Sequence, residues 1–230
     1  MNYPRMIRYF RPQSPAAGII ILIIGVFVLL GGSGGLSSRN GATAGIIMML
    51  VGAGLIAAGI LMLIQMRRNK VTDAEVDAAI GVGVTEVITK DKILIASRGV
   101  EATDVPPLTL YSFVWEGATY KRRGQDGLWR SNLIEVLYAV FGPDSIHAAT
   151  DTFSITGPEP KTSTTHEVFY RDVVSVEIGT LSHRGGQGQV FSITTSGGTS
   201  IACGVVATPE NVAAVEAARA LIMNRKRESL

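Results

Sequence analysis

The three histidines and the single cysteine are the side chains of this sequence best suited to binding a metal ion. A zinc or iron site needs three or four ligands that converge on one ion, often spaced along a helix face or in a Cys-x-x-Cys turn. No two of His147, His166 and His183 have such a spacing, and Cys203 has no second thiol. We therefore expect no metal site and no disulfide within the chain.

Paired carboxylates would be a second source of chemistry, because two of them held together can act as acid and base. Asp151, Glu167, Asp172 and Glu177 are scattered over different predicted strands, and nothing in the sequence brings two together. The glycine-rich segment 184–188 lacks the Lys-Ser/Thr and the strand-loop-helix context of a phosphate loop. We expect no catalytic residue, no cofactor and no enzymatic activity.

A cluster of basic residues surrounds the predicted turn at Asp126-Gly127. Lys121, Arg122 and Arg123 precede the turn, and Arg130 follows it. Such side chains bind anionic groups through charge-assisted hydrogen bonds, and each contributes about 1 kcal/mol near a charged lipid surface. They are candidates for contact with anionic lipid headgroups, and the alternative is a solvated turn.

Short β-type runs parted by turns contain all of these candidates, from residue 108 onward. Branched and aromatic residues bounded by Gly, Pro, Asn and Asp favour strands. Thr208 as an N-cap, followed by Pro209, predicts a C-terminal helix after the last strand. The predicted strands are 111–120, 129–141, 145–156, 164–170, 173–179, 189–195 and 199–205.

A helical segment is expected before the strands. Thr72 and Glu75 form a capping-box pattern, which predicts that a helix begins there. The Gly81-Val-Gly83 interruption leaves open whether residues 71–96 form one helix or two. Pro106-Pro107 separates this juxtamembrane segment, residues 67–107, from a domain at 108–230.

Three segments, 126–130 (DGLWR), 151–155 (DTFSI) and 167–176 (EVFYRDVVSV), resemble an uncharacterised group of bacterial membrane proteins. The resemblance implies two N-terminal membrane helices and a cytoplasmic pleckstrin-homology-like (PH-like) domain, an α+β fold whose bent antiparallel sheet is closed by a C-terminal helix. It implies no activity. Because PH-like sheets commonly bind peptides along an open edge or beside that helix, a partner surface is expected at residues of the first and third segments. These residues are Trp129, Phe169, Tyr170, Arg171 and Asp172.

Two uncharged apolar runs, 16–32 and 44–66, precede these segments. They contain 17 and 23 residues, and a helix that crosses a bilayer needs roughly 17 to 25. Residues 16–66 are therefore predicted to be a transmembrane hairpin with an outer loop at 33–43, following a cytoplasmic tail at 1–15. Basic residues flank the outer ends of the pair, whereas the loop contains one, which predicts that both termini are cytoplasmic. The flanking residues are Arg5, Arg8, Arg11, Arg67, Arg68 and Lys70, against Arg39 in the loop.

A stripe of glycines occurs in the second run. Gly45, Gly52 and Gly59 recur at every seventh position. Small residues on one helix face let another helix approach closely. Packing against the first run and packing against a second copy of the chain are both open.

Charge is divided unevenly along the chain. Residues 1–70 contain seven Lys and Arg and no Asp or Glu, and the whole chain contains 21 basic and 19 acidic residues. Residues 71–230 therefore contain 14 basic and 19 acidic residues, a net charge of −5. Such a domain is a poor general binder of nucleic acid.

Together these observations favour a non-enzymatic membrane-anchored adaptor or scaffold in the bacterial inner (cytoplasmic) membrane. Its expected partners are the lipid bilayer and either a protein or a second copy of the chain. The alternative function is a self-assembling membrane effector whose helices form a pore or disrupt the bilayer. An alternative to the hairpin is a cleaved signal peptide, which would leave one anchor and place the domain outside.

Overall fold

The computed structural model describes residues 2–11, 14–35, 42–68, 70–100, 105–158, 162–183, 186–206 and 208–229. Their contacts divide the chain into two compact units. The helix-pair unit is Arg11–Thr72, and the sheet unit combines Met1–Phe10 with Asp73–Leu230. The predicted tip of the glycine-rich turn at Arg184-Gly185, and most of the predicted outer loop, at 36–41, lie outside the described residues.

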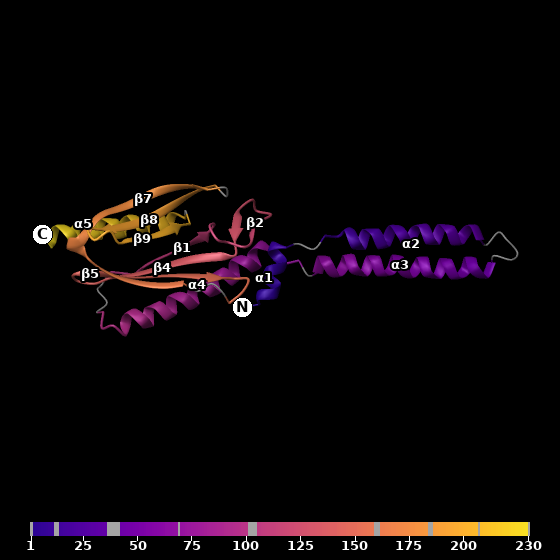
Figure 1. Ribbon diagram of the computed structural model, residues 1–230, viewed down its shortest axis with the longest axis horizontal. Coiled ribbons are helices and arrows are strands. Elements are labelled where there is room, and N and C mark those ends of the chain that lie inside the picture. The colour runs from indigo at the N-terminus through magenta and orange to yellow at the C-terminus, as the bar shows by residue number, and fades with distance from the viewer. Residues whose placement is uncertain are drawn as a thin grey trace. The chain divides into compact units, whose positions relative to one another are not determined.

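The helix-pair unit consists of α2 (Ala16–Gly35) and α3 (Ala42–Arg68), which lie side by side (Figure 1). Both helices are long and apolar enough to cross a membrane, over Ala16–Ser33 and Thr43–Arg68. The two apolar runs are therefore helical, as the sequence predicts.

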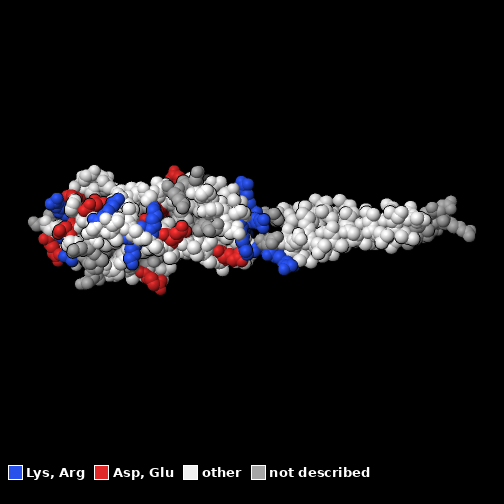
Figure 2. Space-filling view, turned by 90° about the horizontal axis from the view of Figure 1, so that it is seen from below, with Lys and Arg blue, Asp and Glu red and all other residues white. Residues whose placement is uncertain are grey.

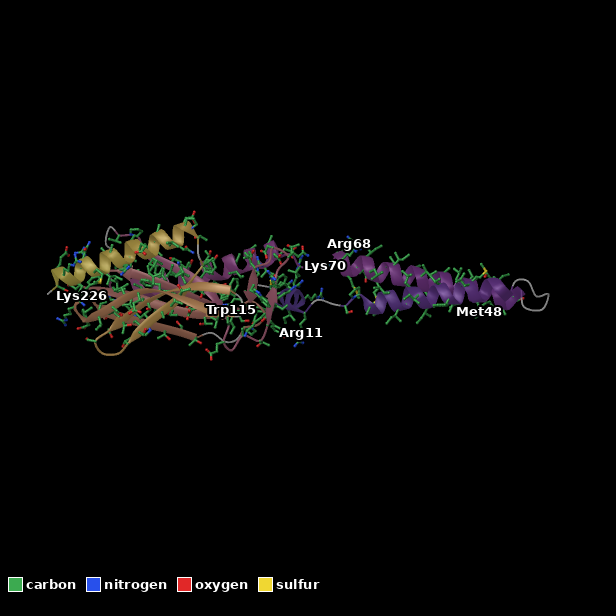
Figure 3. The ribbon with its side chains drawn as sticks, turned by 90° about the horizontal axis from the view of Figure 1, so that it is seen from above. Arg11, Met48, Arg68, Lys70, Trp115 and Lys226 are labelled. Carbon is green, nitrogen blue, oxygen red and sulfur yellow. The ribbon has the colours of Figure 1, made fainter. Side chains whose placement is uncertain are left out.

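The outer surface of the helix pair is apolar. Phe27 is 71% exposed and Leu50 is 69% exposed. In the face seen in Figure 2, its coloured side chains are basic and lie at one end. Figure 3 places Met48 at the opposite end from Arg68 and Lys70. An exposed apolar surface of this extent marks an interaction site, and its length fits the apolar core of a membrane.

Two matching glycine stripes join the helices. A Cβ added at Gly52 would lie 2.7 Å from the backbone nitrogen of Leu29, and one added at Gly25 would lie 2.9 Å from the backbone nitrogen of Ile56. The stripe predicted in the second run therefore packs within the hairpin, against a stripe on the first run that we did not predict. The buried residues of the two helices, among those whose burial is described, are Gly18, Gly25, Gly32, Gly45, Gly52 and Gly59.

The described strands of the sheet unit form three antiparallel sheets. The first sheet has the strand order β1-β4-β5-β6 and the second β7-β8-β9, while β2 and β3 form a separate hairpin. The strands are β1 (Leu108–Val114), β2 (Lys121–Arg123), β3 (Trp129–Ser131), β4 (Leu133–Phe141), β5 (Ser145–Ser154), β6 (Thr162–Phe169), β7 (Val173–His183), β8 (Gly186–Thr195) and β9 (Ser200–Val205).

The bounds of most predicted strands differ from the structure, strand β2 was not predicted, and two predictions need correction beyond their bounds. The first strand ends at Val114 rather than at 120. The predicted strand 129–141 is two strands, because Asn132 breaks it. The Asn132 side chain is buried, where its Oδ1 accepts from the Tyr120 amide at 2.9 Å and its Nδ2 donates to Thr156 Oγ1 at 2.9 Å.

One core lies between the first sheet, the second sheet and α5 (Pro209–Glu228). Leu110, Phe191 and Ile222, one from each, are fully buried there. The helix begins as predicted, with Thr208 Oγ1 accepting from the Asn211 amide at 3.2 Å and proline in the first turn. The α+β class, with two long apolar helices, antiparallel sheets and a C-terminal helix, is confirmed.

A single helix, α4 (Asp73–Ala96), covers the other face of the first sheet. Ile95 packs against Tyr138 and Ala149, whereas the alternate strand residues face the core, because neighbouring side chains in a strand point to opposite faces. The helix continues through Gly81 and Gly83, so the segment that the sequence left open is one helix.

The expected N-terminal tail is instead a helix in the sheet unit, α1 (Tyr3–Phe10). Met6, Tyr9 and Phe10 are buried. The Phe10 ring stacks on the Tyr120 ring with centroids 6.1 Å apart. Tertiary contacts therefore hold a segment that is too short to be a stable helix alone.

Candidate functional site

The two segments that flank the helix pair in sequence are bound to each other. Tyr9 Oη of α1 donates to Asp73 Oδ1 of α4 at 2.8 Å. Arg5 Nη2 lies 2.9 Å from Glu75 Oε1. Burial and the hydrogen bond to Asp73 raise the pKa of Tyr9 to about 12, so the phenol keeps its proton and remains a donor.

Arg130 of β3 fixes the start of α4 to the β2–β3 hairpin. Its Nε and Nη2 donate to the two carboxylate oxygens of Asp77, both at 2.7 Å. Its Nη2 and Nη1 donate to the two oxygens of Asp126 at 2.6 and 3.0 Å. The Arg130 side chain is 3% exposed. The hydrogen bonds from Arg130 lower the pKa of Asp126 to about 2, so its carboxylate stays charged.

Arg122 of β2 fixes α1 to the same hairpin. Its guanidinium carbon lies 4.6 Å from the centroid of the Tyr9 ring, and its Nη1 donates to the Tyr9 carbonyl oxygen. We call Tyr9, Asp73, Asp77, Arg122 and Arg130 the clamp. The clamp joins α1, α4 and the β2–β3 hairpin into one assembly.

These contacts change the prediction that the basic residues of the β2–β3 hairpin bind lipid headgroups. It is wrong for Arg130, because that guanidinium is buried between two carboxylates. Arg122 is half-buried, and its guanidinium contacts the ring and the carbonyl oxygen of Tyr9. Lys121 and Arg123 are exposed, with Arg123 Nε donating to the Gly127 carbonyl oxygen at 2.9 Å, and for these two the headgroup hypothesis stays a prediction.

The predicted partner residues 169–172 divide between surface and core. Phe169 is 40% exposed, and the Arg171 guanidinium carbon lies 5.3 Å from the centroid of its ring. Tyr170 is 1% exposed and donates to the Gly142 carbonyl oxygen at 3.0 Å, so its assignment to a partner surface is wrong. Asp172 is half-buried, and its carbonyl oxygen accepts from the Ser196 amide.

Trp129 does not share a surface with Phe169. Both are partly exposed, at 38% and 40%. Phe169 pairs with Ser145 at the start of β5, whereas Leu133, which follows β3, pairs with Ser154 at its end. Nine residues of strand separate these positions, or about 30 Å.

An exposed apolar patch lies where the chain passes from the first sheet to the second. Val174 is 59% exposed and follows Phe169 across a single 3₁₀ turn, Tyr170–Asp172. The pairing of β7 with β8 shifts register between Val173 and Ser175, which leaves Val174 as the extra residue of a bulge. Strand β7 pairs only with β8 among the described strands, so its other side is a sheet edge.

A pair of carboxyl groups is buried between α4 and the first sheet. Asp91 of α4 is fully buried and Asp151 of β5 is 4% exposed. Within the described part of the chain, neither oxygen of Asp91 has a hydrogen-bond partner, nor has Oδ1 of Asp151. Asp151 Oδ2 accepts from Lys90 Nζ at 2.8 Å. Burial and the neighbouring Asp151 raise the pKa of Asp91 to about 6.

The carboxylate that meets Asp151 is therefore Asp91, which was not among the four considered from the sequence. The sequence contains a signal for its partner, because the buried positions of α4 include Val76, Ile80, Val84, Asp91 and Ile95. Asp91 thus falls on the apolar stripe of an amphipathic helix, where an ionisable residue is exceptional.

A second cluster, Ser145, His147 and Glu167, has the residue types of a hydrolytic triad without its geometry. Ser145 Oγ lies 3.1 Å from His147 Nε2, and Glu167 Oε1 lies 3.9 Å from the same nitrogen. In a triad the acid orients the histidine through Nδ1 while the serine uses Nε2. Here both groups approach one nitrogen, so the cluster is better explained as a cross-strand polar contact between β5 and β6.

Over the described ranges, no group of three or more His, Cys, Asp and Glu residues could hold a metal ion. Cys203 is buried, and burial together with the nearby Glu135 raises the pKa of its thiol. No protein-family model matches this chain, and comparison with curated proteins and with solved structures finds no match.

Proposed function

We propose that this protein is a non-enzymatic membrane-anchored adaptor, in which the helix pair spans the bacterial inner membrane and the sheet unit lies in the cytoplasm. The observation that carries the proposal is the clamp. The segments that precede and follow the helix pair both belong to the sheet unit. This supports a chain that enters and leaves the membrane on one side, as a hairpin does.

The clamp also argues against a cleaved signal peptide. Cleavage after the first apolar run would remove α1, with Met6, Tyr9 and Phe10. It would leave Arg122 without the Tyr9 ring and Asp73 without the Tyr9 hydroxyl. Basic residues at the outer ends of the pair favour the cytoplasm for these ends.

The fold of the sheet unit is, in this proposal, PH-like. Two antiparallel sheets around one core, with a C-terminal helix packed against both, support it. A fold alone does not establish function, so the proposed binding site is argued from the surface.

We propose that a protein partner adds an extended segment along the β7 edge, beside Phe169 and Val174. An edge strand offers unpaired backbone groups to a new strand, and exposed apolar side chains beside it supply burial. The two side chains are 40% and 59% exposed, so a partner could bury both without unfolding the domain.

Site-specific photocrosslinking in native membranes tests this proposal. A benzoylphenylalanine at Val174 should give a discrete protein adduct that is lost on Phe169→Ala. The same amino acid at Trp129, which is 38% exposed and lies near the far end of the first sheet, is the control. Equal adducts at the two positions, or an adduct unaffected by Phe169→Ala, would reject the β7 site.

The effector alternative is weaker than the sequence suggested. That alternative depended on a glycine stripe of α3 that could pack against another copy of the chain. In the structure this stripe packs against α2.

A further inference from the structure

The buried carboxyl pair joins the helix that follows the membrane hairpin to the domain. Asp91 is the ionisable residue of α4 that is fully buried, and it meets Asp151 of β5. The other titratable groups that face it are Tyr138 from β4 and Lys90 from its own helix. Lys90 is already bound to Asp151 Oδ2 at 2.8 Å and to Ser163 Oγ at 3.3 Å.

The burial of two neighbouring carboxyl groups favours a proton between them. Three carboxyl oxygens of the pair lack a hydrogen-bond donor. Asp151 is already paired with Lys90, so a second negative charge on Asp91 beside it is opposed by both desolvation and like-charge repulsion. A proton on one carboxyl would let it donate to the other, and unlike a metal ion it needs no shell of further ligands.

We propose that Asp91 and Asp151 share one proton when α4 lies closed on the first sheet, and that loss of this proton releases the C-terminal half of α4. The pair then acts as a pH-sensitive latch between the helix and the domain.

The contacts of α4 determine which half moves. Its first turns are held by the clamp, through Asp73 and Asp77. Gly81 and Gly83 follow, and glycine favours a helix less than every residue except proline, so the helix is weakest there. Beyond them the helix is held by the carboxyl pair, by the contacts of Lys90 with the first sheet, and by Ile95, which packs on Tyr138 and Ala149.

Release of the C-terminal half of α4 would expose the surface of the first sheet that this half covers at acid pH. Tyr138 and Ala149 are 4% and 0% exposed beneath Ile95. The latch requires only α4 and the first sheet, so it holds whatever partner the β7 edge binds.

Hydrogen exchange of the full-length chain in lipid nanodiscs tests the latch. The pKa of Asp91 is about 6 in the closed state and 3.8 in the open state. The equilibrium constant for opening of the C-terminal half of α4 should therefore rise about tenfold between pH 5 and pH 7.5. Amides of residues 88–96 should lose protection by that factor after correction for intrinsic rates. Amides of α5 should keep theirs.

Three variants separate the latch from a general loss of structure. Asp91→Asn has nearly the same shape and can donate to Asp151 at every pH, so protection should become independent of pH. Gly81→Ala, where an added Cβ meets no atom within 4 Å, should reduce opening at every pH. Glu86→Gln, an exposed carboxyl of the same helix, should behave as wild type. Wild-type protection that does not change with pH, or the same change in Asp91→Asn, would overturn the proposal.

Discussion

Removing the Arg130 guanidinium should loosen the clamp by a predictable amount. Arg130→Gln deletes four charge-assisted hydrogen bonds of 2.6 to 3.0 Å. Breaking a fully buried ion pair costs about 3 to 5 kcal/mol. Asp77 and Asp126 are 50% and 38% exposed, so water can solvate them once the arginine is gone. We therefore expect a loss of about 2 to 3 kcal/mol.

Thermal unfolding of the full chain in detergent, followed by tryptophan fluorescence, measures this loss. For a domain of this size each 1 kcal/mol lowers Tm by about 2 to 4 °C, so Arg130→Gln should lower it by about 5 to 10 °C. Arg123→Gln on the same hairpin is the control, because Arg123 is exposed and its Nε contacts a carbonyl oxygen. Its effect should stay below about 0.5 kcal/mol.

A double-mutant cycle assigns the effect to the Asp77 contact. Asp77→Asn combined with Arg130→Gln should cost at least about 1 kcal/mol less than the sum of the single losses, because both remove the same bidentate pair. An Arg130→Gln protein that unfolds within about 2 °C of Arg123→Gln would refute the clamp as a stabilising contact.

Three further perturbations test other parts of the structure. Gly52→Leu should destabilise the helix pair by about 1 to 3 kcal/mol, measured by thermal unfolding followed by far-UV circular dichroism. Gly54→Leu should have no effect, because a Cβ at Gly54 meets no atom within 4 Å. Equal effects of the two substitutions would contradict the packing of α2 on α3. Thr208→Ala should lower Tm by about 2 to 4 °C through loss of the N-cap of α5, and Thr208→Ser should restore it. Burial raises the pKa of Asp91 from 3.8 to about 6, so the folded state binds a proton more tightly than the unfolded state, and stability is lost as pH rises from about 4 to about 6. Asp91→Asn should therefore be more stable than wild type by about 3 kcal/mol at pH 7.5 and no more stable at pH 3.5. Denaturant titrations of the detergent-solubilised chain measure this difference. A difference in unfolding free energy that is the same at both pH values would contradict the buried carboxyl.

Local patterns predicted most of the regular structure. The Thr208-Pro209 start of α5 and the two apolar helices depend on neighbouring residues, so the sequence was sufficient for them. Helix α1 was not predictable in this way, because eight residues are too few for a stable helix alone. Its Arg5 and Tyr9 side chains bind residues more than sixty positions away.

The candidate site was less predictable for the same reason. The basic hairpin at 121–130 has the pattern of a solvated or anion-binding turn, and only the fold brings Asp77 to Arg130. The pairing of Asp91 with Asp151 joins residues sixty positions apart. The position of Asp91 on the apolar stripe of α4 was a usable sign that this carboxyl has an unusual environment. It did not indicate which residue contacts Asp91.

The central claim, that the helix pair is a membrane hairpin with both ends on the side of the sheet unit, is tested most directly by thiol labelling. In a Cys203→Ala background, single cysteines at Asn2, at Ser38 in the predicted outer loop and at exposed Ser196 would be treated with an impermeant maleimide in bacterial spheroplasts. A hairpin of this orientation predicts labelling at Ser38 in intact spheroplasts, and labelling at Asn2 and Ser196 only after the membrane is opened. Labelling of Ser196, or of Asn2, in intact spheroplasts would contradict it.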